Sequence, residues 1–373
     1  MAIRDVAEGL SPVEKYSIGK LAWNRIGMAT AIHAMQETGG QEFLGTLWKY
    51  EFPFIKKQCE TVMDKYGLHG ETAAVANLVQ LSLIWGFGYD WHAPNVTKDH
   101  FIEAYGLWCP LVQAAHEMGI DDGADLMPNW CDMFSTQIGK AVADNIFVCH
   151  AYCPTRGDNM CRTAFVELED DPLFDDEHIF QEVVRLKKKV REQLTPVPDE
   201  YSAMPLPPFF DSFVPETIAK ESVDLLGRCT CHIILAAAAL MGWDKFLDVL
   251  DEKHTNGYKY AAMKSRADFN VAGNELTDAA AMLMLGYETM GFHDRKIAVL
   301  SPDKIEITGG RCPMVEAAGD FGSDMATRDA SRWCDYYHNI TVKLFGKDCH
   351  CVHRLCPLKG DKECRVLLAR EGI

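Results

Sequence analysis

Residues 150–169 read HAYCPTRGDNMCRTAFVELE, and residues 353–372 read HRLCPLKGDKECRVLLAREG. The two stretches share the pattern His-x-x-Cys-Pro-x-x-Gly-Asp-x-x-Cys-Arg at an offset of 203 residues. The glycine favours a tight reversal of the chain, and the alternating apolar residues after the last cysteine favour a β-strand. Each stretch therefore predicts a hairpin that carries one histidine and two cysteines.

The same offset aligns further parts of the chain. Cys109-Pro110 meets Cys312-Pro313, and Trp130-Cys131-Asp132 meets Trp333-Cys334-Asp335. Four of the six cysteines in the first half fall on cysteines of the second half. We therefore predict that the chain is one ancestral domain written twice, which forms an internal pseudo-dimer.

A proline-rich segment separates the two copies. It reads TPVPDEYSAMPLPPFF and contains five prolines. Because proline fixes φ and lacks a backbone donor, we predict a first copy at 1–194, a linker at 195–214 and a second copy at 215–373. Helices come first in each copy, and antiparallel strands with a crossing helix come second. The predicted fold class is α+β.

Local signals place some of the helices. The pattern Ser11-Pro12-x-Glu14 predicts a helix start with a capping box. A second helical segment is predicted from about Gln41, with a break near Pro53. The basic run 187–189 lies on a polar helix and is interpreted as a solvated face.

Composition limits the classes of partner. The net charge of -17 and the lack of a basic patch exclude a nucleic-acid role. Fourteen cysteines without an apolar leader at the N-terminus favour reduced thiols over disulfides. The longest apolar run, residues 233–243, is too short to cross a bilayer. We therefore expect a cytoplasmic protein with neither a nucleic-acid nor a membrane partner.

Each copy supplies a Cys₃His set with the spacing of a zinc site. Four such ligands form a closed tetrahedral shell, which favours a structural role for the metal. The alternative is that the thiols are buried apolar side chains. The predicted ligands of the two sites are Cys131, His150, Cys153 and Cys161, and Cys334, His353, Cys356 and Cys364.

Cys109 and Cys312 are candidate reacting thiols. Each lies at the end of a predicted strand and before a helix N-terminus, where the pKa of a thiol can be lowered. Either cysteine is predicted to act as nucleophile or general acid/base, assisted by Asp132 or Asp335, with His116 as a further candidate in the first copy. The alternative is a packing cysteine at a tight turn.

Five potential ligands occur in the second copy alone. A second metal ion or an iron–sulfur cluster is one interpretation of these residues, and stray buried cysteines are the other. The residues are Cys229, Cys231, His232, Cys349 and Cys351.

These motifs resemble the vinyl-reductase (V4R) type small-molecule-binding domain and the related L-2-amino-thiazoline-4-carboxylic acid hydrolase family. The resemblance covers about sixty residues in each copy and leaves out the helical first part. The V4R zinc site implies ligand roles for Cys131, Cys153 and Cys161, with His150 in place of an acidic residue. The Cys-Pro dipeptide at Cys109 is closer to the hydrolase branch.

The resemblance implies a metal-containing enzyme for a small cyclic or heteroatom-bearing organic acid. Hydrolytic ring opening or C–N or C–S cleavage is the expected reaction. One alternative is an iron-centre redox enzyme or lyase that uses the extra ligands of the second copy. Another is a small-molecule sensor or carrier with structural zinc and no catalysis. Further homo-oligomerisation is left open.

Overall fold

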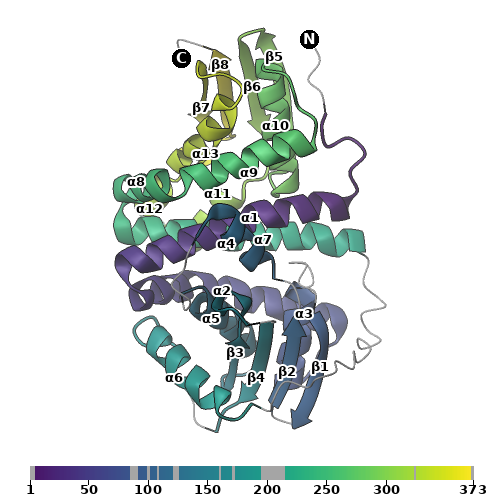
Figure 1. The fold of residues 1–373 in the computed structure, drawn as a ribbon, viewed down its shortest axis with the longest axis vertical. Helices are drawn as coiled ribbons and strands as arrows, with labels where there is room; N and C mark the ends of the chain where they lie inside the picture. The colour runs from purple at the N-terminus through teal and green to yellow at the C-terminus, as the bar shows by residue number, and fades with distance from the viewer. Residues whose placement is uncertain are drawn as a thin grey trace. The chain divides into compact units, whose positions relative to one another are not determined.

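Helices predominate in this protein, and two small antiparallel sheets accompany them (Figure 1). The predicted α+β class is confirmed. The computed structural model describes residues 5–84, 91–98, 101–106, 109–120, 126–158, 161–169, 173–194, 215–322 and 325–370.

The chain divides into two compact units. Unit 1 comprises Met1–Thr30, Ala114–Ile120 and Ala219–Ile373, and unit 2 comprises Ala31–Gln113 and Asp121–Ile218. Unit 1 thus takes two segments from the predicted first copy. The predicted limits of the two copies and the linker concern repetition in the sequence. A division into compact units does not test them, so they stay a prediction.

In unit 2, a four-stranded sheet with the order β1-β2-β4-β3 packs against helices. Helix α5 lies on β3, and helices α2, α3 and α6 contact α5. Both faces of β3 and β4 are buried along almost their whole length. The elements are α2 (Gly40–Tyr66), α3 (Ala73–Ile84), β1 (Trp91–Lys98), β2 (Phe101–Gly106), α5 (Leu126–Val142), β3 (Ile146–Tyr152), η2 (Pro154–Arg156), β4 (Cys161–Glu167) and α6 (Ile179–Arg191).

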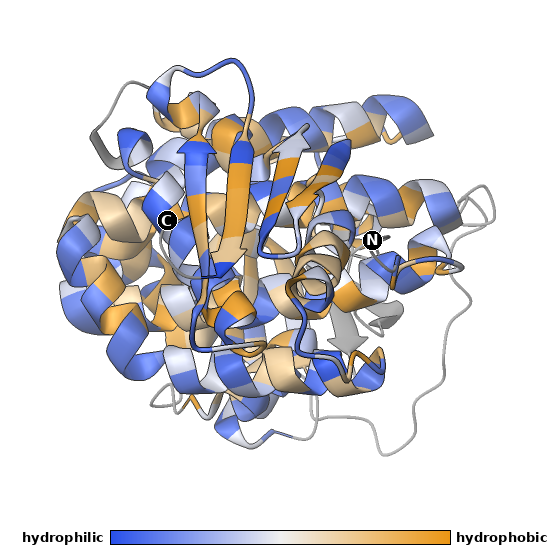
Figure 2. Ribbon diagram, turned by 90° about the horizontal axis from the view of Figure 1, so that it is seen from above, coloured by the Kyte–Doolittle hydropathy of each residue, from blue (hydrophilic) through white to orange (hydrophobic). Residues whose placement is uncertain are grey.

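In unit 1, the sheet order is β5-β6-β8-β7, with α13 against β7 and α10 against β6 and β8. Figure 2 shows hydrophobic residues concentrated in the middle of these strands. The elements are α7 (Pro215–Met241), α8 (Trp243–Lys253), α9 (Thr255–Asp268), α10 (Leu276–Thr289), β5 (Arg295–Ser301), β6 (Lys304–Gly309), α11 (Pro313–Phe321), α12 (Met325–Arg328), α13 (Ser331–Lys343), β7 (Cys349–Leu355), η4 (Pro357–Lys359) and β8 (Arg365–Arg370). Unit 1 also includes the N-terminal part of helix α1 (Pro12–Thr38) and the C-terminal part of helix α4 (Pro110–Met118).

The first two helices show one prediction confirmed and one corrected. The Ser11 backbone N–H donates to Glu14 Oε2 at 2.8 Å, and the Glu14 N–H donates to Ser11 Oγ at 3.2 Å, which confirms the capping box. Helix α2, however, runs through Pro53 without a break. Proline removes one helical hydrogen bond. The buried face that includes Leu47 and Ile55 is continuous across it, and tertiary packing holds the helix.

The cysteines of the two Cys-Pro dipeptides lie outside the sheets. β6 ends at Gly309, so Cys312 lies outside the sheet as the residue that precedes α11. β2 ends at Gly106, and Cys109 precedes α4.

The segment Glu216–Met241 of α7 is long and apolar enough to cross a membrane, and 78% of its most apolar window is buried, as in the core helix of a globular unit.

Candidate functional site

Four cysteines of unit 2 lie close together, and we call them the first thiol cluster. Burial raises the pKa of Cys131 and of Cys161, and the charges of neighbouring cysteines of the group raise both values further. The electrostatic interaction among these thiols makes them neighbours within unit 2. The cluster consists of Cys109, which precedes α4, Cys131 on α5, Cys153 after β3 and Cys161 at the start of β4.

Unit 1 contains a corresponding second thiol cluster. Burial raises the pKa of Cys334, and the charges of the other three members raise it further. In both clusters the cysteine of the Cys-Pro dipeptide joins the three cysteines of the predicted zinc site. The members are Cys312, which precedes α11, Cys334 on α13, Cys356 after β7 and Cys364 just before β8.

The hairpin that carries two cysteines of each cluster is built in the same way in both units. Gly157 has a φ of 86° and Gly360 a φ of 93°, a conformation that favours glycine. The backbone N–H of Cys153 donates to the Asp158 carboxylate at 2.6 Å, and Cys356 does the same to Asp361 at 2.7 Å. The shared Gly-Asp pair therefore fixes the turn between the two cysteines.

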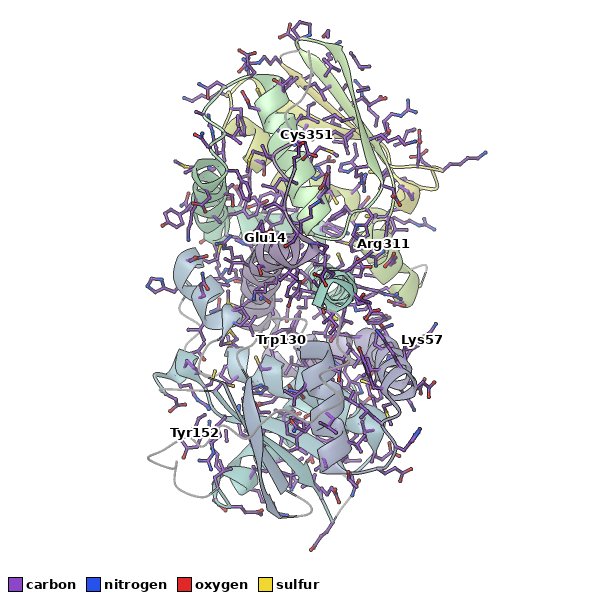
Figure 3. The ribbon with its side chains drawn as sticks, turned by 90° about the vertical axis from the view of Figure 1, so that its right-hand side faces the viewer. Glu14, Lys57, Trp130, Tyr152, Arg311 and Cys351 are labelled. Carbon is purple, nitrogen blue, oxygen red and sulfur yellow. The ribbon has the colours of Figure 1, made fainter. Side chains whose placement is uncertain are left out.

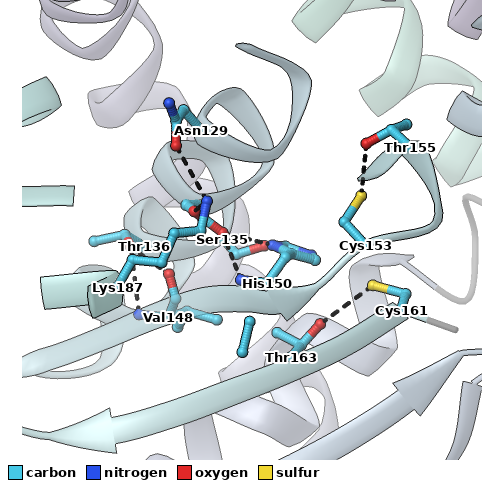
Figure 4. A network of polar contacts seen from close by, with 12 residues as sticks. Asn129, Ser135, Thr136, Val148, His150, Cys153, Thr155, Cys161, Thr163 and Lys187 are labelled. Carbon is cyan, nitrogen blue, oxygen red and sulfur yellow. Dashed lines mark hydrogen bonds and ion pairs between the residues drawn. The ribbon is translucent and has the colours of Figure 1, made fainter. Parts of the chain in front are cut away.

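A buried polar network holds the histidine of unit 2 (Figure 4). His150 Nδ1 lies 3.0 Å from Asp132 Oδ1, and the His150 backbone N–H donates to the same oxygen at 2.5 Å. Lys187 forms an ion pair with Asp132 and donates to Asn129 Oδ1 at 3.1 Å. Burial opposes ionisation of Asp132, but Lys187 and His150 outweigh it and lower the pKa of Asp132.

The burial of Lys187 corrects the sequence interpretation. Lys187 is 5% exposed, whereas Lys188 and Lys189 are exposed as expected. Lys187 follows buried Val183 by four positions and precedes buried Val190 by three, so the three side chains share one helix face. The apolar periodicity of α6 was the signal that could have identified it.

In unit 1 the corresponding histidine connects an aspartate to a thiol. His353 Nδ1 lies 2.6 Å from Asp335 Oδ1, and its ring also forms a hydrogen bond with Cys364. Burial opposes the charged imidazolium, but the bonds to Asp335 and Cys364 outweigh it and raise the pKa of His353 to about 9. Burial likewise opposes the thiolate, yet His353 and Arg295 lower the pKa of Cys364.

Arg295 is a second charged partner of this cluster that the sequence did not indicate. Its guanidinium hydrogen-bonds to Cys364 and stands over the rings of Tyr287 and Phe292, at 4.9 and 5.5 Å from their centroids. Burial opposes its charge, but Cys364 and Tyr287 outweigh that effect and raise the pKa of Arg295. A permanent positive charge therefore faces the second thiol cluster.

The predicted metal ligands stay a prediction. Within the part of the chain that the structure describes, no group of three or more His, Cys, Asp or Glu residues is arranged so as to hold a metal ion. His150 and His353 each direct Nδ1 toward an aspartate, which leaves Nε2 as the nitrogen for a metal. All fourteen cysteines are free thiols.

The predicted reacting thiols do not have the expected acidity. Burial raises the pKa of Cys109 to about 12 and that of Cys312 to about 11, despite hydrogen bonds from the backbone of the following helix. The loss of hydration on burial disfavours the thiolate more strongly than the backbone N–H groups at the start of the helix favour it. The expectation of lowered values was wrong, and Cys364 has the lowered value instead. His116 is exposed on α4 in unit 1, whereas Cys109 belongs to unit 2.

The five extra ligands of the second copy lie on two elements and have separate partners. His232 Nε2 lies 2.7 Å from Asp320 Oδ2. Cys231 and Cys351 are each close enough to the second thiol cluster to interact with its charges, and Cys349 interacts with Arg370. Cys229 is buried on α7. No metal-holding group among the described residues unites the five.

A cavity in unit 1 adjoins the second thiol cluster, and we call it the thiol-side cavity. About 80 Å³ of it is open to a water-sized sphere. His338 lines it, bonds through Nε2 to the Tyr287 hydroxyl at 2.9 Å and stacks on His353 with 5.3 Å between ring centroids. Most of the wall is apolar or aromatic and includes Ile26, Tyr258, Met282, Phe292, Trp333 and Cys334.

Comparisons with known proteins identify no relative. No family model matches the chain, and neither a curated protein nor a solved structure matches it. The resemblance to the V4R and thiazoline-hydrolase families therefore rests on the residues quoted for it.

Proposed function

We propose that the chain arose by tandem duplication. The two sheets have corresponding strand orders, and in each unit helices connect the second strand in the chain to the third. Each β-ladder also has an irregularity just after its histidine, between His150 and Tyr152 and between His353 and Leu355. The offset that aligns the cysteines also aligns these features, which supports one ancestral domain.

We propose further that three cysteines of each thiol cluster, together with the histidine of that unit, hold a zinc ion. Thiolate and imidazole are the ligands that zinc prefers, and an aspartate on Nδ1 is the usual support of a zinc-bound histidine. The donor set thus fits the ion in chemistry. The residues that would hold it are Cys131, His150, Cys153 and Cys161 in unit 2 and Cys334, His353, Cys356 and Cys364 in unit 1. When bound, zinc would tie a helix to a hairpin and polarise nearby groups.

We propose that unit 1 acts on a small cyclic organic acid by hydrolysis. The observation that carries this proposal is the position of the thiol-side cavity, which Cys334 of the second thiol cluster lines directly. A mostly apolar pocket with a few polar groups is typical of a small-molecule site. Hydrolysis would break a C–N or C–S bond, add the hydroxyl of water to carbon and leave a proton on nitrogen or sulfur.

Four donors complete a zinc shell, so Cys312 is a fifth group left over in unit 1. Since its pKa is about 11, this thiol keeps its proton near neutral pH, and we propose that it protonates a leaving nitrogen that is more basic than the thiolate. Asp335 fixes the orientation of His353 through Nδ1. The aromatic wall packs against the ring of the substrate.

The experiment combines metal analysis with turnover of L-2-amino-thiazoline-4-carboxylic acid, the substrate named by the resemblance. We expect two zinc ions per chain, and loss of turnover with both ions retained in Cys312→Ala. Cys109→Ala changes the corresponding residue of unit 2 and is the matched control, which should keep turnover. Full turnover in Cys312→Ala would contradict the assigned role.

A second candidate is hydrolysis without a metal, with Cys364 as nucleophile. The specific observation in its favour is the chain of hydrogen bonds from Asp335 through His353 to Cys364, together with the lowered pKa of this thiol. Turnover by protein that contains no metal, abolished in Cys364→Ala, would favour this candidate over the first.

A further inference from the structure

A second cavity in unit 1 adjoins the thiol-side cavity, and we call it the arginine-side cavity. About 90 Å³ of it is open to a water-sized sphere. The two cavities have wall residues in common, among them Tyr258, Met282 and Thr341. Arg25 and Ser265 line the arginine-side cavity alone, and Cys334 and His338 line the thiol-side cavity alone. The pair therefore has a cationic end and a thiol end.

Arg25 is the one charged residue among the described residues that line the two cavities. It is 7% exposed, and both of its hydrogen bonds to Glu117, from Nε and Nη2, reach the same oxygen, Oε2. Lys264 Nζ lies 3.3 Å from the other oxygen of Glu117. Two cations thus share one carboxylate at this end.

The guanidinium of Arg25 retains binding capacity. Arginine has five N–H donors in a planar fork, and Nη1 forms no hydrogen bond to any described residue. A buried nitrogen without a hydrogen bond would be one of the unsatisfied buried atoms of the described residues. Nη1 is not among those atoms, so solvent or a ligand can reach it. A carboxylate of a ligand is the group that such a donor binds best.

The size of the cavities indicates a small ligand that extends through both. An apolar cavity of about 150 Å³ binds benzene, and each of these cavities is smaller than that, whereas the two together are slightly larger. A single ring with a short carboxylate-bearing chain fits these dimensions. The aromatic side chains of the wall favour a flat ring.

We propose that Arg25 binds the carboxylate of a small cyclic organic acid, whose ring lies against the wall residues common to the two cavities and points toward Cys334. Binding of the acid by Arg25 would identify the substrate class of the proposed function. Only the reaction near Cys334 rests on that proposed function. Binding of the acid is independent of that reaction. The second copy has its own arginine–carboxylate pair, Arg228 and Asp320, which lines neither cavity.

The test is calorimetric titration of the purified 373-residue chain with 3-phenylpropanoate and with its uncharged amide, 3-phenylpropanamide. A charged hydrogen bond predicts that the acid binds about tenfold more tightly than the amide. In Arg25→Met/Glu117→Met, which removes both charges together and so avoids an unpaired buried ion, the preference should vanish. In Arg228→Met/Asp320→Met, the matched control, it should persist.

A single variant keeps the proposal testable if the double variant does not fold. Glu117→Gln removes the carboxylate that competes for Arg25, so the acid should bind more tightly and the amide should not. Equal binding of acid and amide by the wild type, binding of neither, or a preference that survives in Arg25→Met/Glu117→Met would each overturn the proposal. A preference for the acid in a protein without turnover would contradict the hydrolytic function alone.

Discussion

Lys187 places its ammonium group on the carboxylate of Asp132 inside unit 2, where the two side chains are 7% and 0% exposed. The lysine comes from α6 and the aspartate from α5. In unit 1, Asp335 pairs with His353, and the described residues provide no lysine for it. The charge of Asp132 is thus balanced by Lys187 within unit 2.

Lys187→Met should destabilise the protein strongly. Removal of Lys187 leaves the buried carboxylate of Asp132 with His150 alone, and the loss of one partner of a buried ion pair costs about 3–5 kcal/mol in the free energy of unfolding. Denaturant unfolding measures the change. Lys188→Met, at the exposed neighbouring position, is the control and should change the free energy by less than about 0.5 kcal/mol. Similar effects of the two substitutions would show that the ion pair contributes nothing.

Loss of one cluster cysteine should remove one metal ion. If each thiol cluster holds zinc, Cys161→Ser and Cys364→Ser should each lower the zinc content from two ions to about one per chain, because the ion loses a thiolate ligand. Elemental analysis provides the count. Cys59 is a buried thiol outside both clusters, so Cys59→Ser should retain two ions. Equal zinc contents in all three variants would contradict the assignment of ligands.

Asp320 should make stability depend on acid pH. Burial opposes its ionisation, but His232 and Arg228 outweigh that effect and lower the pKa of Asp320 in the folded state. A depressed pKa stabilises the fold above the unfolded value of about 3.9, and the contribution is lost as pH falls through the folded value.

Asp320→Asn should therefore lower the unfolding midpoint at pH 7, and its difference from the wild type should shrink as pH falls below about 4. Thermal unfolding at a series of pH values measures it. Asp244 pairs with Arg332 at the surface and is 91% exposed, so Asp244→Asn is the control that should have little effect at any pH. A difference that stays constant with pH would show that Asp320 acts through packing and not through charge.

Gly19 marks the closest approach of α1 to α10 in unit 1. A Cβ atom at this position would lie 1.6 Å from the backbone oxygen of Thr289, so Gly19→Ala forces the helices apart. We expect a loss of at least about 1–3 kcal/mol in the free energy of unfolding. Gly319→Ala is the control on α11, since its Cβ would meet nothing within 4 Å. An unchanged midpoint in Gly19→Ala would mean that the contact relaxes without cost.

The sequence by itself determined the local features of this protein. The capping residues Ser11 and Glu14 fixed the start of α1, and Gly157 and Gly360 fixed the two hairpins. These features depend on residues a few positions apart, whose conformational preferences act before any tertiary contact forms. The α+β class followed from the same kind of signal.

The tertiary structure decided which distant groups meet. It brought Cys109 and Cys312 into the thiol clusters, buried Lys187 against Asp132 and set Arg25 on the wall of a cavity. It also reversed the expected acidity of Cys312, because burial outweighs the favourable helix terminus. Contacts of this kind depend on how helices pack across long separations in the chain. The periodicity of α6 marks Lys187 as buried, but no short pattern in the sequence names the partner that it meets.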